Sequence, residues 1–165
     1  MIILGVDPGS AIVGYSILNK DEKNRQNIQV VDFGCITTDK SLLTPERLNI
    51  VYKGILKLIE KYKPDLMSVE SLYFFKNLKT IIPVGQAKGV ILLAASQKNV
   101  DVIEFTPLQV KMAIAGYGRA EKKQVQKMIE ETLDLKNFDM KKNNRKKDDA
   151  FDALGVALCA AFKSF

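Results

Sequence analysis

The sequence predicts an α/β fold in which three consecutive strands come first and helices and strands then alternate. Two observations support this prediction. Three short runs rich in β-branched and aromatic residues follow one another in the N-terminal part of the chain, with no helical pattern between them. From Thr44 onward, segments with apolar residues at helical spacing alternate with short apolar runs. Strands joined by a helical crossover run parallel, so we expect a mixed sheet of three antiparallel strands followed by parallel ones.

Each expected strand is a short apolar run bounded by residues that favour turns. The first run ends at Pro8-Gly9, and Pro64 precedes the fourth. The five strands are expected at residues 1–7, 11–19, 28–37, 65–70 and 101–105.

The expected helices are recognised by their start signals and by their apolar spacing. Thr44 as N-cap and Pro45 at the first helical position predict a helix to Tyr62, and Thr106 with Gln109 forms a capping box. Pro83 lies inside another helical stretch and is expected to delay or kink it. The helices are expected at residues 44–62, about 77–98, 106–115, about 120–133 and from 149 onward, and residues 136–147 are expected to form a loop.

Length and composition favour a single domain spanning residues 1–165, because 165 residues with 47% hydrophobic content can bury one core. The longest apolar run near the C-terminus, residues 153–162, is too short to cross a bilayer, and no export signal is visible. Cys35 and Cys159 are far apart and form no CxxC pair, which argues against a disulfide framework or a thiolate metal site. We therefore expect a soluble, cytoplasmic protein.

The chain has no histidine, which excludes catalytic triads that depend on imidazole and the common zinc sites that use histidine. Its net charge is +6, and the excess lies in residues 109–147, where eleven Lys and Arg face five Asp and Glu. Such a one-sided charge attracts a polyanion, most simply nucleic acid. A solvated, lysine-rich surface would give the same count.

Acidic residues end two of the expected strands and begin the last helix. Asp7 and Glu70 end strands that should be parallel neighbours, so their side chains should lie at the same edge of the sheet, where α/β proteins bind ligands. Asp149 and Asp152 are three positions apart and share one face of the last helix. That face can close over the strand ends, and we therefore expect Asp7, Glu70, Asp149 and Asp152 to converge.

Four carboxylates in one crevice repel one another unless cations neutralise them. In a chain without histidine, Mg²⁺ bound by oxygen ligands is the natural choice, and two such ions suit hydrolysis of a phosphodiester. The expected activity is therefore metal-assisted hydrolysis of a nucleic-acid backbone. Each group also has a plain structural explanation, since aspartates cap helices and Asp7 before Pro8-Gly9 can open a turn.

Several motifs together resemble those of the bacterial RuvC Holliday-junction resolvases. They match in order and spacing over nearly the whole chain: LGVDPGS (4–10), SVES (68–71), GQAKGV (85–90), TPLQVK (106–111), GYGRAEKKQV (116–125) and DDAFDALG (148–155). The resemblance implies a ribonuclease H-like fold and a homodimer that cuts two opposed strands of a four-way DNA junction during recombination and repair. It also implies Mg²⁺ or Mn²⁺ as cofactor, with two ions per active site.

By motif position, the resemblance makes Asp7, Glu70, Asp149 and Asp152 the catalytic, metal-binding set. Asp149 is preferred to the adjoining Asp148 because the family spacing is an acidic residue or histidine, two residues, then aspartate.

The resemblance also predicts DNA contacts by Tyr73, Lys111 and Lys122, and a branch-migration complex is a further candidate partner. The basic segment 141–147 has no counterpart in the family pattern and is either a DNA clamp or an insert. Two alternatives stay open: a ribonuclease H-like enzyme that processes RNA, and a non-catalytic junction-binding protein.

Overall fold

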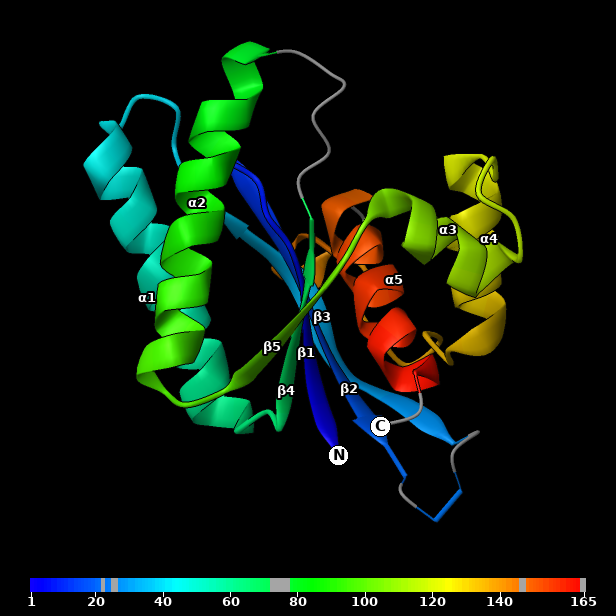
Figure 1. Cartoon of the computed structure of the whole chain (residues 1–165). Coiled ribbons are helices and arrows are strands. Elements are labelled where there is room, and N and C mark those ends of the chain that lie inside the picture. Colours follow the sequence, from blue (N-terminus) through cyan, green and yellow to red (C-terminus); the bar gives the residue numbers. More distant parts are fainter. Residues whose placement is uncertain (22, 25–26, 72–77, 146–147, 164–165) are drawn as a thin grey trace.

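The computed structural model describes residues 1–21, 23–24, 27–71, 78–145 and 148–163 of the chain. A five-stranded sheet forms its centre, with helices on both faces (Figure 1). Its strands follow the order β3-β2-β1-β4-β5 and comprise β1 (Ile2–Asp7), β2 (Ile12–Lys20), β3 (Ile28–Thr37), β4 (Leu66–Glu70) and β5 (Asp101–Phe105). The pairs β1–β2 and β2–β3 are antiparallel, whereas β1–β4 and β4–β5 are parallel, which confirms the predicted mixed sheet.

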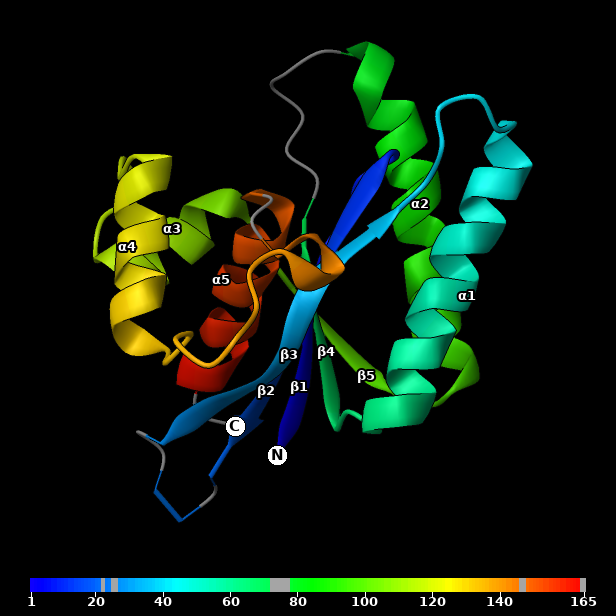
Figure 2. The ribbon, with the colours of Figure 1, turned by 180° about the vertical axis from the view of Figure 1, so that it is seen from behind.

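The helices form one layer on each face of this sheet. They are α1 (Thr44–Tyr62), α2 (Leu78–Gln97), α3 (Pro107–Ala115), α4 (Lys122–Thr132) and α5 (Asp148–Phe162), with a short 3₁₀ turn, η1 (Lys142–Asn144), between the last two. Helices α1 and α2 cover one face (Figures 1 and 2). Helix α5 lies on the other face, and α3 and α4 pack outside it (Figures 1 and 2).

Two hydrophobic cores result, one on each side of the sheet. On the α1 side, Ile55 and Ile91 pack against strand residues such as Met67. On the α5 side, nearly every residue of α5 from Ala150 to Ala161 is buried, because small alanines let the helix sit close to the sheet. The apolar C-terminal run of the sequence is therefore a core helix.

Close contact between α5 and the sheet depends on small residues in the strands. A Cβ atom added at Gly5 would lie 2.4 Å from the carbonyl oxygen of Ala153. The buried hydroxyl of Ser16 donates to that same carbonyl (2.8 Å). Ser68 donates in the same way to the carbonyl of Val156 (2.8 Å). These two hydrogen bonds fix the position of α5 along the strands as well as its distance from them.

The structure differs from the sequence-based expectation in local details. Helix α1 begins at Thr44 with Leu43, not Thr44, at the N-cap, and the Leu43 amide donates to the carboxylate of Glu46 (2.8 Å). Helix α2 begins at Leu78 and continues through Pro83. Within the described part of the chain, no helix is both long enough and apolar enough to cross a membrane.

Candidate active site

The ends of two parallel neighbours, β1 and β4, bring the first two acidic residues together. Val6 pairs with Val69, so Asp7 and Glu70 come next at the same edge of the sheet. Both side chains are half-buried, and the two carboxyls are hydrogen-bonded to each other. This contact is the one expected from the position of both residues at strand ends.

Helix α5 begins at this same edge, and Gly14 allows its first turn to approach. Gly14 on β2 pairs directly with Asp7. A Cβ atom added at Gly14 would lie 1.8 Å from the carbonyl oxygen of Asp149, so only glycine leaves room for the helix there. The backbone of Asp149 is therefore seated beside the strand position opposite Asp7.

The electrostatics of Asp7 show how closely the acidic groups gather. Burial, the charges of Glu70 and Asp152, the hydrogen bond with Glu70 and the charge of Asp149 together raise the pKa of Asp7 from 3.8 to about 9. Burial also raises the pKa of Glu70, and the charge of Asp152 adds to this effect, whereas the contact with Asp7 and the charge of Lys122 oppose it. The charges of Glu70, Asp149 and Asp152 thus all act on Asp7.

Lys122 at the start of α4 supplies positive charge to this cluster. Its ammonium lies 2.7 Å from a carboxylate oxygen of Asp152 and 3.4 Å from one of Asp148. Burial raises the pKa of Asp152, and the charges of Asp149 and Asp148 act in the same direction, against the contact with Lys122. Partial burial alone would lower the pKa of Lys122, but its bonds to Asp152 and Asp148 raise it. Lys122 therefore stays charged and offsets part of the local negative charge.

The donor set suits a hard divalent cation. It consists of carboxylate oxygens, and burial together with the neighbouring negative charges raises the pKa of Asp7 to about 9. Among the described residues, however, no three acidic or cysteine side chains are already arranged as a ligand set. Asp7 is bonded to Glu70, and Asp152 is bonded to Lys122. Loading with a cation therefore requires these two contacts to rearrange.

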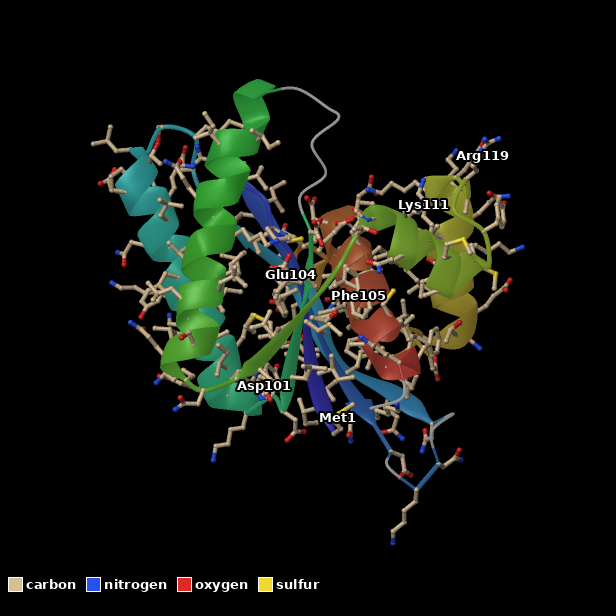
Figure 3. All side chains as sticks on the ribbon, in the orientation of Figure 1. Met1, Asp101, Glu104, Phe105, Lys111 and Arg119 are labelled. Atoms are coloured by element: carbon tan, nitrogen blue, oxygen red, sulfur yellow. The ribbon has the colours of Figure 1, made fainter. Side chains whose placement is uncertain are left out.

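The other predicted residues fall into three situations. Lys111 on α3 lines a pocket of about 170 Å³ together with Glu70, Lys122 and Asp152. Figure 3 shows Lys111 on α3, on the side of the molecule away from α1 and α2. Asp148 is exposed and accepts a hydrogen bond from Gln126 (3.2 Å). Tyr73 lies outside the described residues.

Sequence reasoning missed the residues that place α5. Gly14, Ser16 and Ser68 look like ordinary strand residues, and only the close approach of α5 gives them their role. The sequence predicts that the basic segment 141–147 is either a DNA clamp or an insert, but its Arg145 is buried and holds this loop against β3. The strong basic bias around Arg145 concealed its separate role.

The sequence profile of the family "Crossover junction endodeoxyribonuclease RuvC" matches residues 3–160. The chain belongs to the RuvC family. It is 51% identical to RuvC from Fusobacterium nucleatum over 158 residues, which cover 96% of this chain and 78% of that protein. It is 48% identical to RuvC from Thermosipho melanesiensis over 164 residues, which cover 99% of each chain.

Solved structures agree with this assignment. The structure of Thermus thermophilus RuvC in complex with a Holliday junction substrate superposes with a TM-score of 0.86 at 28% identity, covering 98% of this chain and 93% of that one. The ribonuclease H-like fold implied by the resemblance is thereby confirmed.

Proposed function

We propose that this RuvC-family chain is a structure-selective endodeoxyribonuclease that resolves Holliday junctions by paired, metal-dependent hydrolysis of opposed strands in recombination and repair. The observation that carries the proposal is the convergence of Asp7 and Glu70 at one edge of the sheet with the first turn of α5, which bears Asp149 and Asp152. A cluster of half-buried carboxylates destabilises the fold unless a cation neutralises it, so a purely structural role does not explain it.

Asp7, Glu70, Asp149 and Asp152 would hold the cation, with Mg²⁺ as the cofactor, Mn²⁺ as a substitute and two ions per site. When bound, such ions activate a water molecule and stabilise the leaving oxygen of an in-line phosphodiester displacement. Asp7 must release its proton for this, since its carboxyl is protonated below about pH 9. We assign Asp149 rather than Asp148 to the site, because the charge of Asp149 acts on Asp7 whereas Asp148 turns toward Gln126 on α4.

Lys122 would bind a DNA phosphate once its carboxylate partners bind the cation. Its ammonium lies beside Asp152, so a phosphate next to the cation would lie within its reach. Lys111 lines the same pocket and would add a second positive charge next to the backbone. Tyr73 would stack on bases near the junction centre, as the resemblance implies.

The assembly and its setting are part of the same proposal. We take residues 1–165 as a single domain. A four-way junction is nearly two-fold symmetric, so a homodimer of this chain would place two sites on opposed strands. A cytoplasmic location and a branch-migration complex as partner complete the proposal.

The proposal is tested with three substrates: a mobile four-way DNA junction, a linear duplex of the same sequence and a structured RNA, each with and without Mg²⁺. We expect paired cuts in the junction alone and only with Mg²⁺. Preferential cleavage of the RNA would favour the RNA-processing alternative. Junction binding without any cleavage in Mg²⁺ or Mn²⁺ would favour a non-catalytic binding protein.

A further inference from the structure

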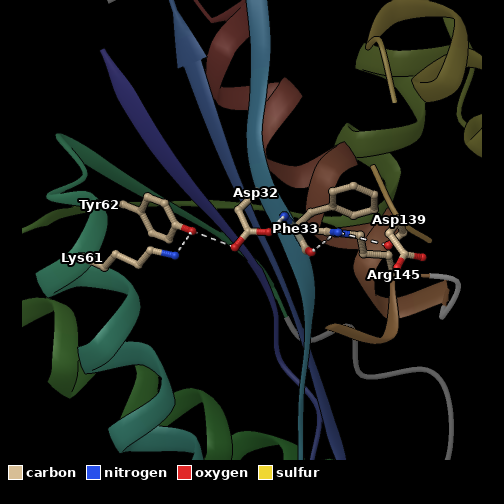
Figure 4. Close-up of polar contacts among 6 residues, drawn as sticks. All are labelled: Asp32, Phe33, Lys61, Tyr62, Asp139 and Arg145. Atoms are coloured by element: carbon tan, nitrogen blue, oxygen red, sulfur yellow. Dashed lines mark hydrogen bonds and ion pairs between the residues drawn. The ribbon is translucent and has the colours of Figure 1, made fainter. Parts of the chain in front are cut away.

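Arg145 lies in the loop between α4 and α5, with 7% of its surface exposed. Its guanidinium forms several polar contacts inside the protein (Figure 4). Its guanidinium donates to a carboxylate oxygen of Asp32 (2.7 Å), to the carbonyl of Phe33 (3.0 Å) and to the carbonyl of Asp139 (3.1 Å). It also lies over the rings of Phe33 (5.3 Å) and Phe138 (4.9 Å). One planar cation therefore joins the edge strand β3 to the loop.

The carboxylate that receives Arg145 is itself fixed from the opposite side of the sheet. The hydroxyl of Tyr62, at the end of α1, donates to the second oxygen of Asp32 (2.7 Å), and Lys61 donates to that hydroxyl (2.7 Å) (Figure 4). Burial alone would raise the pKa of Asp32, but the hydrogen bonds from Tyr62 and Arg145 hold it below its usual range. Asp32 thus remains ionised and the network stays intact at neutral pH.

A contact between aromatic rings leads from Arg145 to the acidic turn of α5, whose first residue is Asp148. Through space, the Phe33 ring beneath the guanidinium meets the Phe151 ring edge-on, with centroids 6.2 Å apart. Phe151 is buried and lies directly before Asp152 in sequence. A shift of the guanidinium would therefore reach the acidic turn through these two rings.

We propose that Arg145 is a positioning residue, which fixes the first turn of α5 and thereby sets how Asp149 and Asp152 meet Asp7 and Glu70. This inference rests on the proposed function for its consequence, since the acidic turn matters only if it binds a cation. It removes Arg145 from any DNA clamp, because the guanidinium is buried and donates to three acceptors inside the protein. Exposed lysines such as Lys141 and Lys142 are left to meet DNA in that segment.

The test compares Arg145→Met with Ile55→Ala. Ile55 is buried in the core on the α1 side of the sheet, so this control perturbs the fold away from α5. Three quantities are measured well below the melting temperature of both variants: the Mn²⁺ dissociation constant by calorimetry, hydrogen exchange of the amides of residues 148–152, and the single-turnover cleavage rate of a four-way junction.

Positioning predicts that Arg145→Met weakens Mn²⁺ binding by about 10-fold or more, as loss of a group that orients metal ligands does. Exchange in residues 148–152 should quicken, and cleavage should slow while junction affinity is kept. Ile55→Ala should lower the melting temperature without these changes. Arg145→Lys should fall between wild type and Arg145→Met, because an ammonium cannot reproduce the planar set of donors.

Unchanged Mn²⁺ affinity and exchange in Arg145→Met, or equal changes in Ile55→Ala, would overturn the inference. If Arg145→Met does not fold, Tyr62→Phe removes the hydroxyl that donates to Asp32 and accepts from Lys61, and it should weaken Mn²⁺ binding about twofold to fivefold. An unchanged value in Tyr62→Phe would then reject positioning. If the wild-type chain binds Mn²⁺ but does not cut the junction, the proposed nuclease activity is rejected and the Arg145 comparison of Mn²⁺ affinity remains valid. If the wild-type chain does not bind Mn²⁺, both the nuclease proposal and the positioning role of Arg145 are overturned.

Discussion

Gly14→Ala directly disrupts the close contact that holds the first turn of α5 over the strand ends. Gly14 pairs with Asp7 in the sheet, and the added Cβ would lie 1.8 Å from the carbonyl oxygen of Asp149 and 2.4 Å from its carbonyl carbon. Both neighbours are backbone atoms, so no side chain can turn away to relieve the overlap. The first turn of α5 must retreat from the sheet.

The distance that the turn must move sets the expected loss of activity. Ordinary van der Waals contact begins at 3.4 Å and the added Cβ would lie at 1.8 Å, so the turn must move by about 1.6 Å. A misplacement of about 1 Å can cost about 100-fold in rate, and overpacking costs about 1–3 kcal/mol of the free energy of unfolding. We therefore expect Gly14→Ala to slow single-turnover junction cleavage about 100-fold while junction affinity changes little.

Gly89→Ala is the matched control. A Cβ at Gly89, on the exposed side of α2, meets nothing within 4 Å, so the same substitution should raise the free energy of unfolding by about 0.5–1 kcal/mol and leave cleavage unchanged. Both variants are compared by urea unfolding, by size-exclusion chromatography and by cleavage under saturating enzyme. If a folded Gly14→Ala variant cleaves the junction at the wild-type rate, the close contact between α5 and β2 does not set the geometry of the site.

Three further predictions concern the charge and packing around the site. The folded chain keeps the proton of Asp7 up to about pH 9 while the unfolded chain loses it near 3.8, so the free energy of unfolding of the metal-free protein should fall as pH rises between these values. Asp7→Asn should flatten that decline in urea titrations, and an equally steep decline in the variant would contradict the raised pKa. Ser68→Ala should cost about 1 kcal/mol in the same titrations through its lost hydrogen bond to α5, and no loss of stability would count against that contact. Replacing Lys141 and Lys142 by Gln should flatten the salt dependence of junction binding, and an unchanged slope would mean that these lysines are only solvated.

Much of the fold was predictable because its signals are local. The five strands are apolar runs with clear stops, and Thr106 with Gln109 forms the capping box at the start of α3 that the sequence predicts. The meeting of Asp7 and Glu70 was also predictable, since parallel neighbours end at one edge of a sheet.

The remaining features depend on contacts between distant residues. Arg145 bonds to Asp32, 113 positions away, and nothing in the run of basic residues separates it from its solvated neighbours. Whether Asp148 or Asp149 faces Asp7 depends on the phase of α5, which the seat at Gly14 fixes.

Parallel assays of wild type and Asp7→Asn on one mobile four-way junction in Mg²⁺ test the central claim most directly, namely that the clustered carboxylates perform the cleavage. The substitution removes the carboxylate and retains the shape of the side chain. We expect the variant to bind the junction about as tightly as the wild type and to yield no product above the background without enzyme. Cleavage by folded Asp7→Asn at a rate near that of the wild type would contradict the assignment.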